Sequence, residues 1–143
     1  MLLLLMPEQV TNYWDEIKVG MNKALPPGAS DRDQTLLAKM LGGIVQVWVS
    51  YYKENDVAVV DGVCLTSVVE DRIHDIRSLL VYALWAIDET HSDTWQEGME
   101  ALKKYAKGRR CSRVIGYTDE ETVLGLVKTL GFEAKYTFVT WEL

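Results

Sequence analysis

The fold is decided by a stretch that begins Ile76-Arg-Ser-Leu-Leu-Val-Tyr-Ala-Leu-Trp-Ala-Ile87. This segment is apolar at nearly every position, which predicts a central strand buried on both faces. A polar loop, Asp88–Asp93, follows it, and then a helical pattern of apolar residues runs from Thr94 to Lys107. A short strand is predicted at Ser112–Tyr117, before a second helix that ends at Leu130-Gly-Phe132. The order strand, helix, strand, helix predicts a sheet with at least one parallel pair.

The residues before this stretch add one strand, two helices and two further strands. The six apolar residues that open the sequence predict a strand, and Pro7 suits the first turn of the helix that follows. Ser30 or Asp31 can cap the second helix. Period-two patterns rich in Val, Trp and Tyr then predict a hairpin. The predicted elements are Met1–Met6, Pro7–Ala24, a helix from the Ser30/Asp31 cap to Leu41, Ile44–Lys53 and Val57–Glu70.

The end of the chain is predicted to return to the sheet. Thr118 or Asp119 can cap the last helix, Gly131 can end it in a left-handed conformation, and Phe132–Leu143 is predicted to be a final strand. The chain is therefore expected to form one domain, residues 1–143. Its fold class is α/β (α+β), a mixed and mostly antiparallel central sheet with helices on both faces, in the order β-α-α-β-β-β-α-β-α-β.

Composition and charge exclude several classes of protein. The net charge is −6, which argues against a nucleic-acid partner because that binding needs a basic face. The apolar start stops at Pro7 and is too short for a membrane span, so no membrane partner is expected and the cytoplasm of the cell that makes the protein is the predicted location. Cys64 and Cys111 lack the spacing of a metal site, and no metal is predicted.

The pattern resembles the GNAT superfamily, the acyl-coenzyme-A N-acyltransferases, over essentially the whole chain. The most specific local similarity is Leu126-Val-Lys-Thr-Leu-Gly-Phe132, which looks like the family segment Leu-Tyr-x-x-x-Gly-Phe. More narrowly, Pro7-Glu8-Gln9-Val10, Trp14 and Ile44–Val49 resemble small GNAT-like proteins of tailed bacteriophages and prophages. The resemblance implies the GNAT fold and, in an active member, acetyl-coenzyme A as the cofactor.

The residues expected to hold that cofactor differ from the family pattern. Active members place Arg/Gln-x-x-Gly-x-Gly/Ala where this chain has Asp88-Glu-Thr-His-Ser-Asp-Thr94. At about 5 Å and an effective dielectric constant of about 20, each phosphate–carboxylate pair repels by roughly 3 kcal/mol. Val127 stands where the family often has a proton-donating tyrosine, and Glu120 where it has an asparagine. Lys128 or Thr129 could face the groove, but neither replaces that tyrosine.

Other candidate residues are few. A general base could be sought among Glu70, Asp71, His74, Asp75 and His91, although a solvated turn or loop explains these residues as well. No catalytic residue is assigned. The candidates for cofactor binding through the backbone are Leu84, Trp85 and Ala86.

The aromatic residues suggest a contact surface. Most of the five tryptophans fall on predicted buried faces, whereas Tyr51, Tyr52, Tyr136 and Trp141 are candidates for a protein–protein patch. Such a patch could bind other proteins, including phage structural proteins, or join copies of this chain.

The leading functional hypothesis is a GNAT-fold protein of phage type that has lost acetyl transfer. It would need no cofactor and would serve as a binding or assembly component, including within a virion. The first alternative is an active acyl-CoA-dependent N-acetyltransferase with a divergent cofactor loop. The second is an acidic inhibitor of a host protein.

Overall fold

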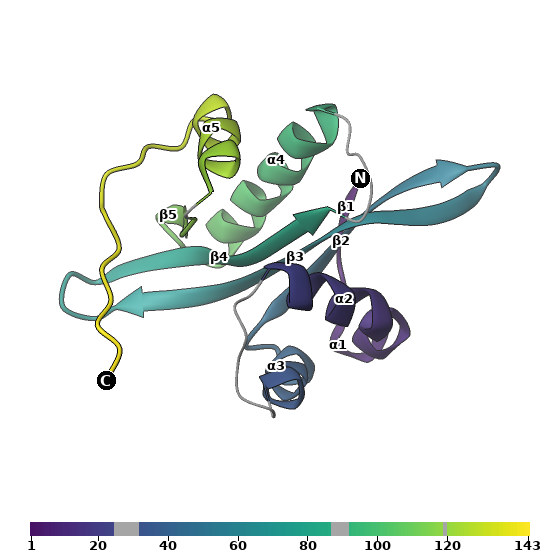
Figure 1. Ribbon diagram of the computed structural model, residues 1–143, viewed down its shortest axis with the longest axis horizontal. Helices are drawn as coiled ribbons and strands as arrows, with labels where there is room; N and C mark the ends of the chain where they lie inside the picture. The colour runs from purple at the N-terminus through teal and green to yellow at the C-terminus, as the bar shows by residue number, and fades with distance from the viewer. Residues whose placement is uncertain (25–31, 87–91, 119) are drawn as a thin grey trace.

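One mixed sheet organises the computed structural model, which describes residues 1–24, 32–86, 92–118 and 120–143 (Figure 1). The sheet has five strands in the spatial order β1-β2-β3-β4-β5. Neighbouring strands pair antiparallel except β4 and β5, which are parallel. The strands are β1 (Leu2–Leu4), β2 (Gln46–Glu54), β3 (Val57–Asp71), β4 (Ile76–Ala86) and β5 (Arg113–Gly116). The predicted fold class is confirmed.

Helices cover both faces of this sheet. On one face lie α1 (Pro7–Val10), α2 (Trp14–Ala24) and α3 (Arg32–Leu41), and on the other lie α4 (Ser92–Gly108) and α5 (Glu121–Thr129) (Figure 1). The single helix predicted from Pro7 to Ala24 is interrupted by a 3-10 turn at Thr11–Tyr13.

Two apolar clusters hold the layers together, one on each side of the sheet. Ile17 and Met21 of α2 are fully buried against inward-facing valines of β2 and β3. On the opposite side, Leu102 and Ala106 of α4 pack on Trp48 and Leu79. Period-two alternation along β2 sends Val47 and Val49 to the first cluster and Trp48 to the second.

A short polar chain crosses the buried interior of the sheet. The indole Nε1 of Trp48 donates to the hydroxyl of Thr66 at 3.0 Å, and that hydroxyl donates to Oε1 of Gln46, also at 3.0 Å. Each of these three side chains therefore has a hydrogen-bond partner, which avoids the cost of leaving its buried donor or acceptor unpaired.

The β2–β3 hairpin turns without glycine. Asn55 and Asp56 both adopt positive φ angles, of 50° and 63°, at the two central positions of the turn. Asn and Asp tolerate this conformation better than other side chains do, so the predicted hairpin forms at the expected place.

The C-terminal part differs from the sequence prediction in two respects. Phe132–Leu143 forms no strand, so the predicted tenth element is wrong: of these residues only Phe132 donates a backbone hydrogen bond to the rest of the described chain, to Val127. The N-cap of α5 is Glu120 rather than Thr118 or Asp119, although the Thr118 hydroxyl accepts the Glu120 N–H at 3.2 Å. Gly131 has φ of 96°, as predicted for the end of that helix.

Candidate functional site

The most distinctive feature of the sheet is an extra residue in β4. Leu65 of β3 pairs with Ala83, but the next residue, Thr66, pairs with Val81, so Tyr82 has no counterpart. The packing reverses at the same point. Val81 packs on the α4 side of the sheet, whereas Ala83 and the indole of Trp85 pack on the α1–α3 side. Tyr82 is therefore a β-bulge, which bends the strand and turns its later side chains to new faces.

The same bulge marks where β4 parts from β5. The parallel pairing runs from Ser78 opposite Arg113 to Val81 opposite Gly116 and extends no further. Beyond Val81, β4 is paired on one side only, with β3 as far as Gly62 opposite Ala86. The backbone groups that the segment from Tyr82 to Ala86 directs away from β3 thus have no strand partner within the described chain. This opening lies where β4 leads toward the start of α4 (Figure 1).

The three sequence candidates for cofactor binding, Leu84, Trp85 and Ala86, all lie on this unpaired segment. Leu84 and Ala86 are exposed, whereas Trp85 is buried. The indole of Trp85 packs directly on Gly20 of α2, so closely that a Cβ at Gly20 would overlap the ring. Trp85 therefore fixes β4 to the opposite helical layer, and its side chain does not face the opening.

A cleft lies between α4 and α5. Its volume is about 560 Å³, and its lining includes Glu97, Glu100 and Lys103 of α4 and Thr129 at the end of α5. Lys103 is already paired with Glu100 at 2.9 Å. The described part of the cleft thus carries no excess positive charge and offers no electrostatic attraction to phosphate groups.

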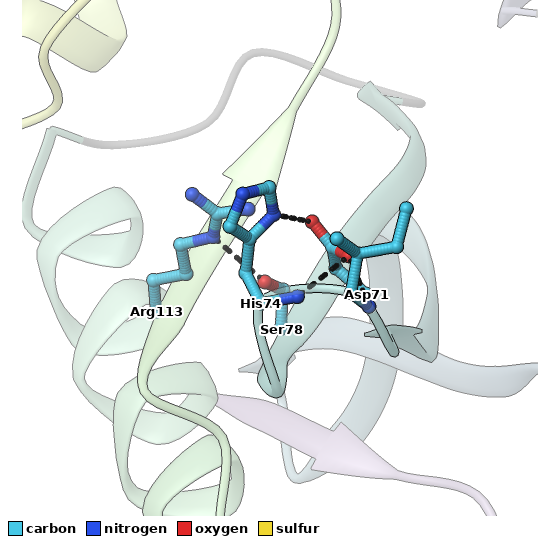
Figure 2. A network of polar contacts seen from close by, with 5 residues as sticks. Asp71, His74, Ser78 and Arg113 are labelled. Carbon is cyan, nitrogen blue, oxygen red and sulfur yellow. Dashed lines mark hydrogen bonds and ion pairs between the residues drawn. The ribbon is translucent and has the colours of Figure 1, made fainter.

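The polar turn between β3 and β4 forms a separate cluster (Figure 2). One carboxylate oxygen of Asp71 lies 2.9 Å from Nδ1 of His74, and the other accepts the backbone N–H of Ile73 at 3.0 Å. These hydrogen bonds, chiefly the one from the His74 side chain, lower the pKa of Asp71 below its usual 3.8. Nearby, Nε of Arg113 donates to the hydroxyl of Ser78 at 2.8 Å.

The position of this turn separates it from the opening. His74 precedes β4, and the bulge at Tyr82 lies six residues beyond the first residue of that strand, Ile76. At about 3.3 Å per residue this is roughly 20 Å. Glu70, Asp71, His74 and Asp75 therefore cannot act directly on a group bound at the opening.

The remaining candidates are placed as follows. Val127 is half-buried in α5, Lys128 is exposed, and the Thr129 hydroxyl donates to the Leu126 carbonyl at 2.6 Å. Asp88, Glu89 and His91 lie outside the described residues, as do most of the predicted phosphate-loop positions. Of the proposed aromatic patch, Tyr136 and Trp141 are exposed, while Tyr51 and Tyr52 are half-buried.

Two kinds of site are absent from the residues that the structure describes. Its residues bring together no group of three or more His, Cys, Asp or Glu side chains that could hold a metal ion. Within the same ranges, the helices are all too short or too polar to cross a membrane.

Three solved structures that superpose on the full chain are acetyltransferases or a probable acetyltransferase. A probable acetyltransferase superposes with a TM-score of 0.76 at 12% identity, covering 100% of this chain and 96% of its own. The complex of AAC(6')-Iy with the bisubstrate analogue CoA-S-monomethyl-acetylneamine gives 0.74 at 12% identity, covering 100% and 97%. The ribosomal-protein-alanine N-acetyltransferase of Brucella melitensis biovar Abortus 2308 gives 0.72 at 10%, covering 100% and 99%.

The chain has the GNAT fold. No family model and no curated protein sequence matches it. The leading functional hypothesis from the sequence, a binding or assembly component without acetyl transfer, is wrong, because the structures that share this fold over the full chain are acetyltransferases. The prediction of no cofactor likewise loses its support, since AAC(6')-Iy was solved with a coenzyme A derivative.

Sequence reasoning missed the bulge at Tyr82. A bulge is a mismatch between two paired strands, and it becomes visible only when the partners are known. The sequence carries no signal of it, because β4 is apolar at nearly every position and such a strand hides a one-residue shift between its faces.

Proposed function

We propose that this protein is an N-acetyltransferase that uses acetyl-coenzyme A and holds it mainly through the β4 backbone. The observation behind the proposal is that the bulge at Tyr82 coincides with the separation of β4 from β5. This leaves a stretch of extended backbone unpaired at an opening in the sheet. The likeness in fold to acetyltransferases adds support.

The chemistry of the cofactor suits such an opening. The pantetheine arm of coenzyme A is a narrow chain with two amide groups, so it can pair with an open strand as a short extra strand would. The segment Tyr82–Ala86 supplies the donors and acceptors, and Leu84 and Ala86 offer exposed apolar side chains beside them. This mode needs no glycine-rich phosphate loop, which agrees with the lack of glycine between Asp88 and Thr94.

In the proposed reaction a neutral amine attacks the thioester carbonyl carbon. The new C–N bond forms, the C–S bond breaks, the amine loses a proton and the coenzyme A sulfur gains one. A backbone N–H in the bulge could stabilise the negative charge that develops on the carbonyl oxygen, because such a donor is fixed before the reaction begins.

Three narrower inferences come from the sequence alone. The similarity of Pro7–Val10 and Ile44–Val49 to phage proteins suggests a phage or prophage source. The host cytoplasm and protein partners are proposed with it. Identification of the neighbouring genes would test these three inferences together.

Thermal unfolding with and without acetyl-coenzyme A tests the proposal. At a ligand concentration of 100 times Kd, the folded state should gain about 2.7 kcal/mol. The variant Leu84→Glu should lose this gain, because it places a carboxylate beside an anionic cofactor. Val57→Glu, the same kind of change at an exposed position near the β2–β3 turn, serves as the control and should keep it.

Two results would overturn the proposal. One is a wild-type protein whose unfolding does not respond to acetyl-coenzyme A. The other is an equal response in Leu84→Glu, which would place binding away from β4. Detection of an acetylated amine by mass spectrometry, with wild type compared with Leu84→Glu, then separates turnover from binding.

A further inference from the structure

Almost all the arginines of the chain lie at one end of the sheet. Five of the six arginines in the sequence lie in or directly beside two connections, the turn from β3 to β4 and the segment from α4 to β5. We call these five residues the arginine cluster: Arg72, Arg77, Arg109, Arg110 and Arg113. The whole chain is acidic, with a net charge of −6, so this end differs in charge from the rest.

The tertiary structure brings the two connections together. The carbonyl of Arg77 accepts the backbone N–H of Ser112 at 2.8 Å, and Nε of Arg113 donates to the hydroxyl of Ser78 at 2.8 Å (Figure 2). Because β4 and β5 are parallel, both strands begin at this end of the sheet. Arg72 directly follows β3, and β5 lies two strand spacings from β3, so the cluster extends about 10 Å across the sheet.

Most of this positive charge is not neutralised within the described chain. Arg77 is half-buried and lies 3.5 Å from a carboxylate oxygen of Glu70. The other four arginines are exposed and form no ion pair with a carboxylate of the described residues: Arg72, Arg109, Arg110 and Arg113. Asp75 is the one carboxylate of the described β3–β4 turn without a cationic partner, because Asp71 is already hydrogen-bonded to His74. The surface of the cluster therefore attracts anions.

Several of these side chains are held in place by neutral groups. The guanidinium of Arg109 donates to the hydroxyl of Tyr105 at 3.1 Å and lies 5.7 Å from the centre of that ring. Arg113 is held by Ser78 in the same way. The end of helix α4 attracts cations, which accounts for Arg109 and its neighbour Arg110 but not for the arginines of the turn and of β5. Donors that are fixed before binding lose less conformational entropy when an anion arrives.

An apolar side chain lies beside the arginines of the turn. Ile73, next to Arg72, is 90% exposed. One carboxylate oxygen of Asp71 accepts the backbone N–H groups of Ile73 at 3.0 Å and of His74 at 3.3 Å, so the turn is fixed and Ile73 is held in water. A ligand that covers this surface would gain by carrying an apolar group as well as negative charge.

We propose that the arginine cluster binds an acidic segment of a partner protein, in which carboxylates lie about three residues apart with an apolar side chain between them. An extended peptide rises about 3.3 Å per residue, so this spacing matches the 10 Å or so across the cluster. The planar guanidinium groups can bind carboxylates in bidentate fashion.

The charge of the rest of the chain favours a short peptide over a nucleic acid. A phosphate backbone carries regularly spaced charge over a long path and would continue onto the acidic remainder of the protein. It would also leave Ile73 uncovered. The cluster lies at the end of β4 opposite to the opening beyond Val81, so this surface is separate from the proposed cofactor site.

Fluorescence anisotropy with a fluorescein-labelled peptide of sequence Glu-Glu-Leu-Glu-Glu tests the proposal. The wild type should bind it saturably at low salt and the neutral peptide Gln-Gln-Leu-Gln-Gln not at all. Arg72→Glu and Arg113→Glu should each raise Kd by roughly tenfold, because each replaces an attraction with a repulsion. Lys53→Glu, the same change of charge at an exposed position in the β2–β3 hairpin at the other end of the sheet (Figure 1), is the control and should keep the wild-type Kd.

Arg72→Glu is the decisive variant, since Arg113 also holds Ser78 and its replacement can disturb the fold, which circular dichroism checks. Ile73→Ser should weaken binding of Glu-Glu-Leu-Glu-Glu severalfold and leave binding of Glu-Glu-Ser-Glu-Glu unchanged.

Three results would overturn the proposal. The first is a wild type that does not bind the acidic peptide, and the second is an unchanged Kd in Arg72→Glu. The third is tighter binding of a single-stranded RNA oligonucleotide than of the peptide, which would assign the arginine cluster to nucleic acid. No acetyl-coenzyme A is present in these measurements, so their outcome is independent of acetyl transfer.

Discussion

The substitution Gly20→Ala should destabilise the protein, although alanine is the better helix former. Gly20 lies inside α2, where its backbone faces the indole of Trp85. An added Cβ would fall on the ring atoms Nε1, Cε2 and Cδ1. Because Trp85 is buried, the ring cannot move aside without disturbing the cluster that contains Ile17 and Met21.

The size of the effect follows from two opposing terms. Replacing glycine by alanine in a helix interior gains up to about 1 kcal/mol. Overpacking a core costs typically about 1–3 kcal/mol, and removal of a large aromatic side chain from its site about 3–5 kcal/mol. We expect a net loss of about 1–3 kcal/mol, or a fall in Tm of roughly 4–12 °C for a chain of this size.

Urea and thermal unfolding, followed by circular dichroism, measure this loss. Gly125→Ala in α5 is the matched control, because a Cβ there meets nothing within 4 Å, and it should stabilise the protein. Trp85→Leu should lower the free energy of unfolding less in the Gly20→Ala background than in the wild type. In that background, removing the indole also removes its overlap with the new Cβ. If Gly20→Ala were as stable as the wild type, the close packing of Trp85 on α2 would be refuted.

Three further outcomes are expected. Thr66→Val should lower the free energy of unfolding by about 1–3 kcal/mol in urea titrations, because it leaves the buried Trp48 indole N–H without its acceptor; a change within error would show that the chain of hydrogen bonds contributes nothing. Burial raises the pKa of the Cys64 thiol to about 12, so mass spectrometry should show Cys64 unmodified by alkylating reagents until the protein unfolds. The pKa of Asp71 is lower in the folded than in the unfolded state, so its stabilising contribution is present above pH 3.8 and lost as pH falls through the folded pKa. Asp71→Asn should remove this part of the acid dependence, and an NMR titration that placed the Asp71 pKa at or above 3.8 would contradict the sign.

Much of the fold was predictable because local patterns agreed with the tertiary arrangement. The valine-rich alternation of β2 and the positive-φ turn at Asn55-Asp56 specify a hairpin from neighbouring residues alone. Residues 132–143 show the limit of such patterns. They have the composition of a strand, but a strand also needs a partner edge, and composition does not say which sheet edge the segment will meet.

The candidate site was less predictable, for a related reason. Leu84, Trp85 and Ala86 could be selected from the sequence as an apolar strand segment near a loop. Their different roles could not, because a single extra residue at Tyr82 decides which face each side chain takes. The functional hypothesis drawn from the acidic Asp88–Asp93 loop gave weight to missing phosphate contacts. The sequence does not reveal that the β4 backbone beyond Val81 is unpaired on the β5 side, because that depends on strand pairing.

Up to residue 130, the sequence by itself determined the kinds of element, their order and the mixed sheet they form, since these follow from hydrophobic period, caps and turns within a few residues of each other. Only the tertiary structure decided where β4 leaves β5 and which helix receives Trp85. It also decided that residues 132–143 stay outside the sheet. Each of these depends on the pairing or packing of residues far apart in the chain. The free energy of such contacts belongs to both partners and cannot be assigned from either segment alone.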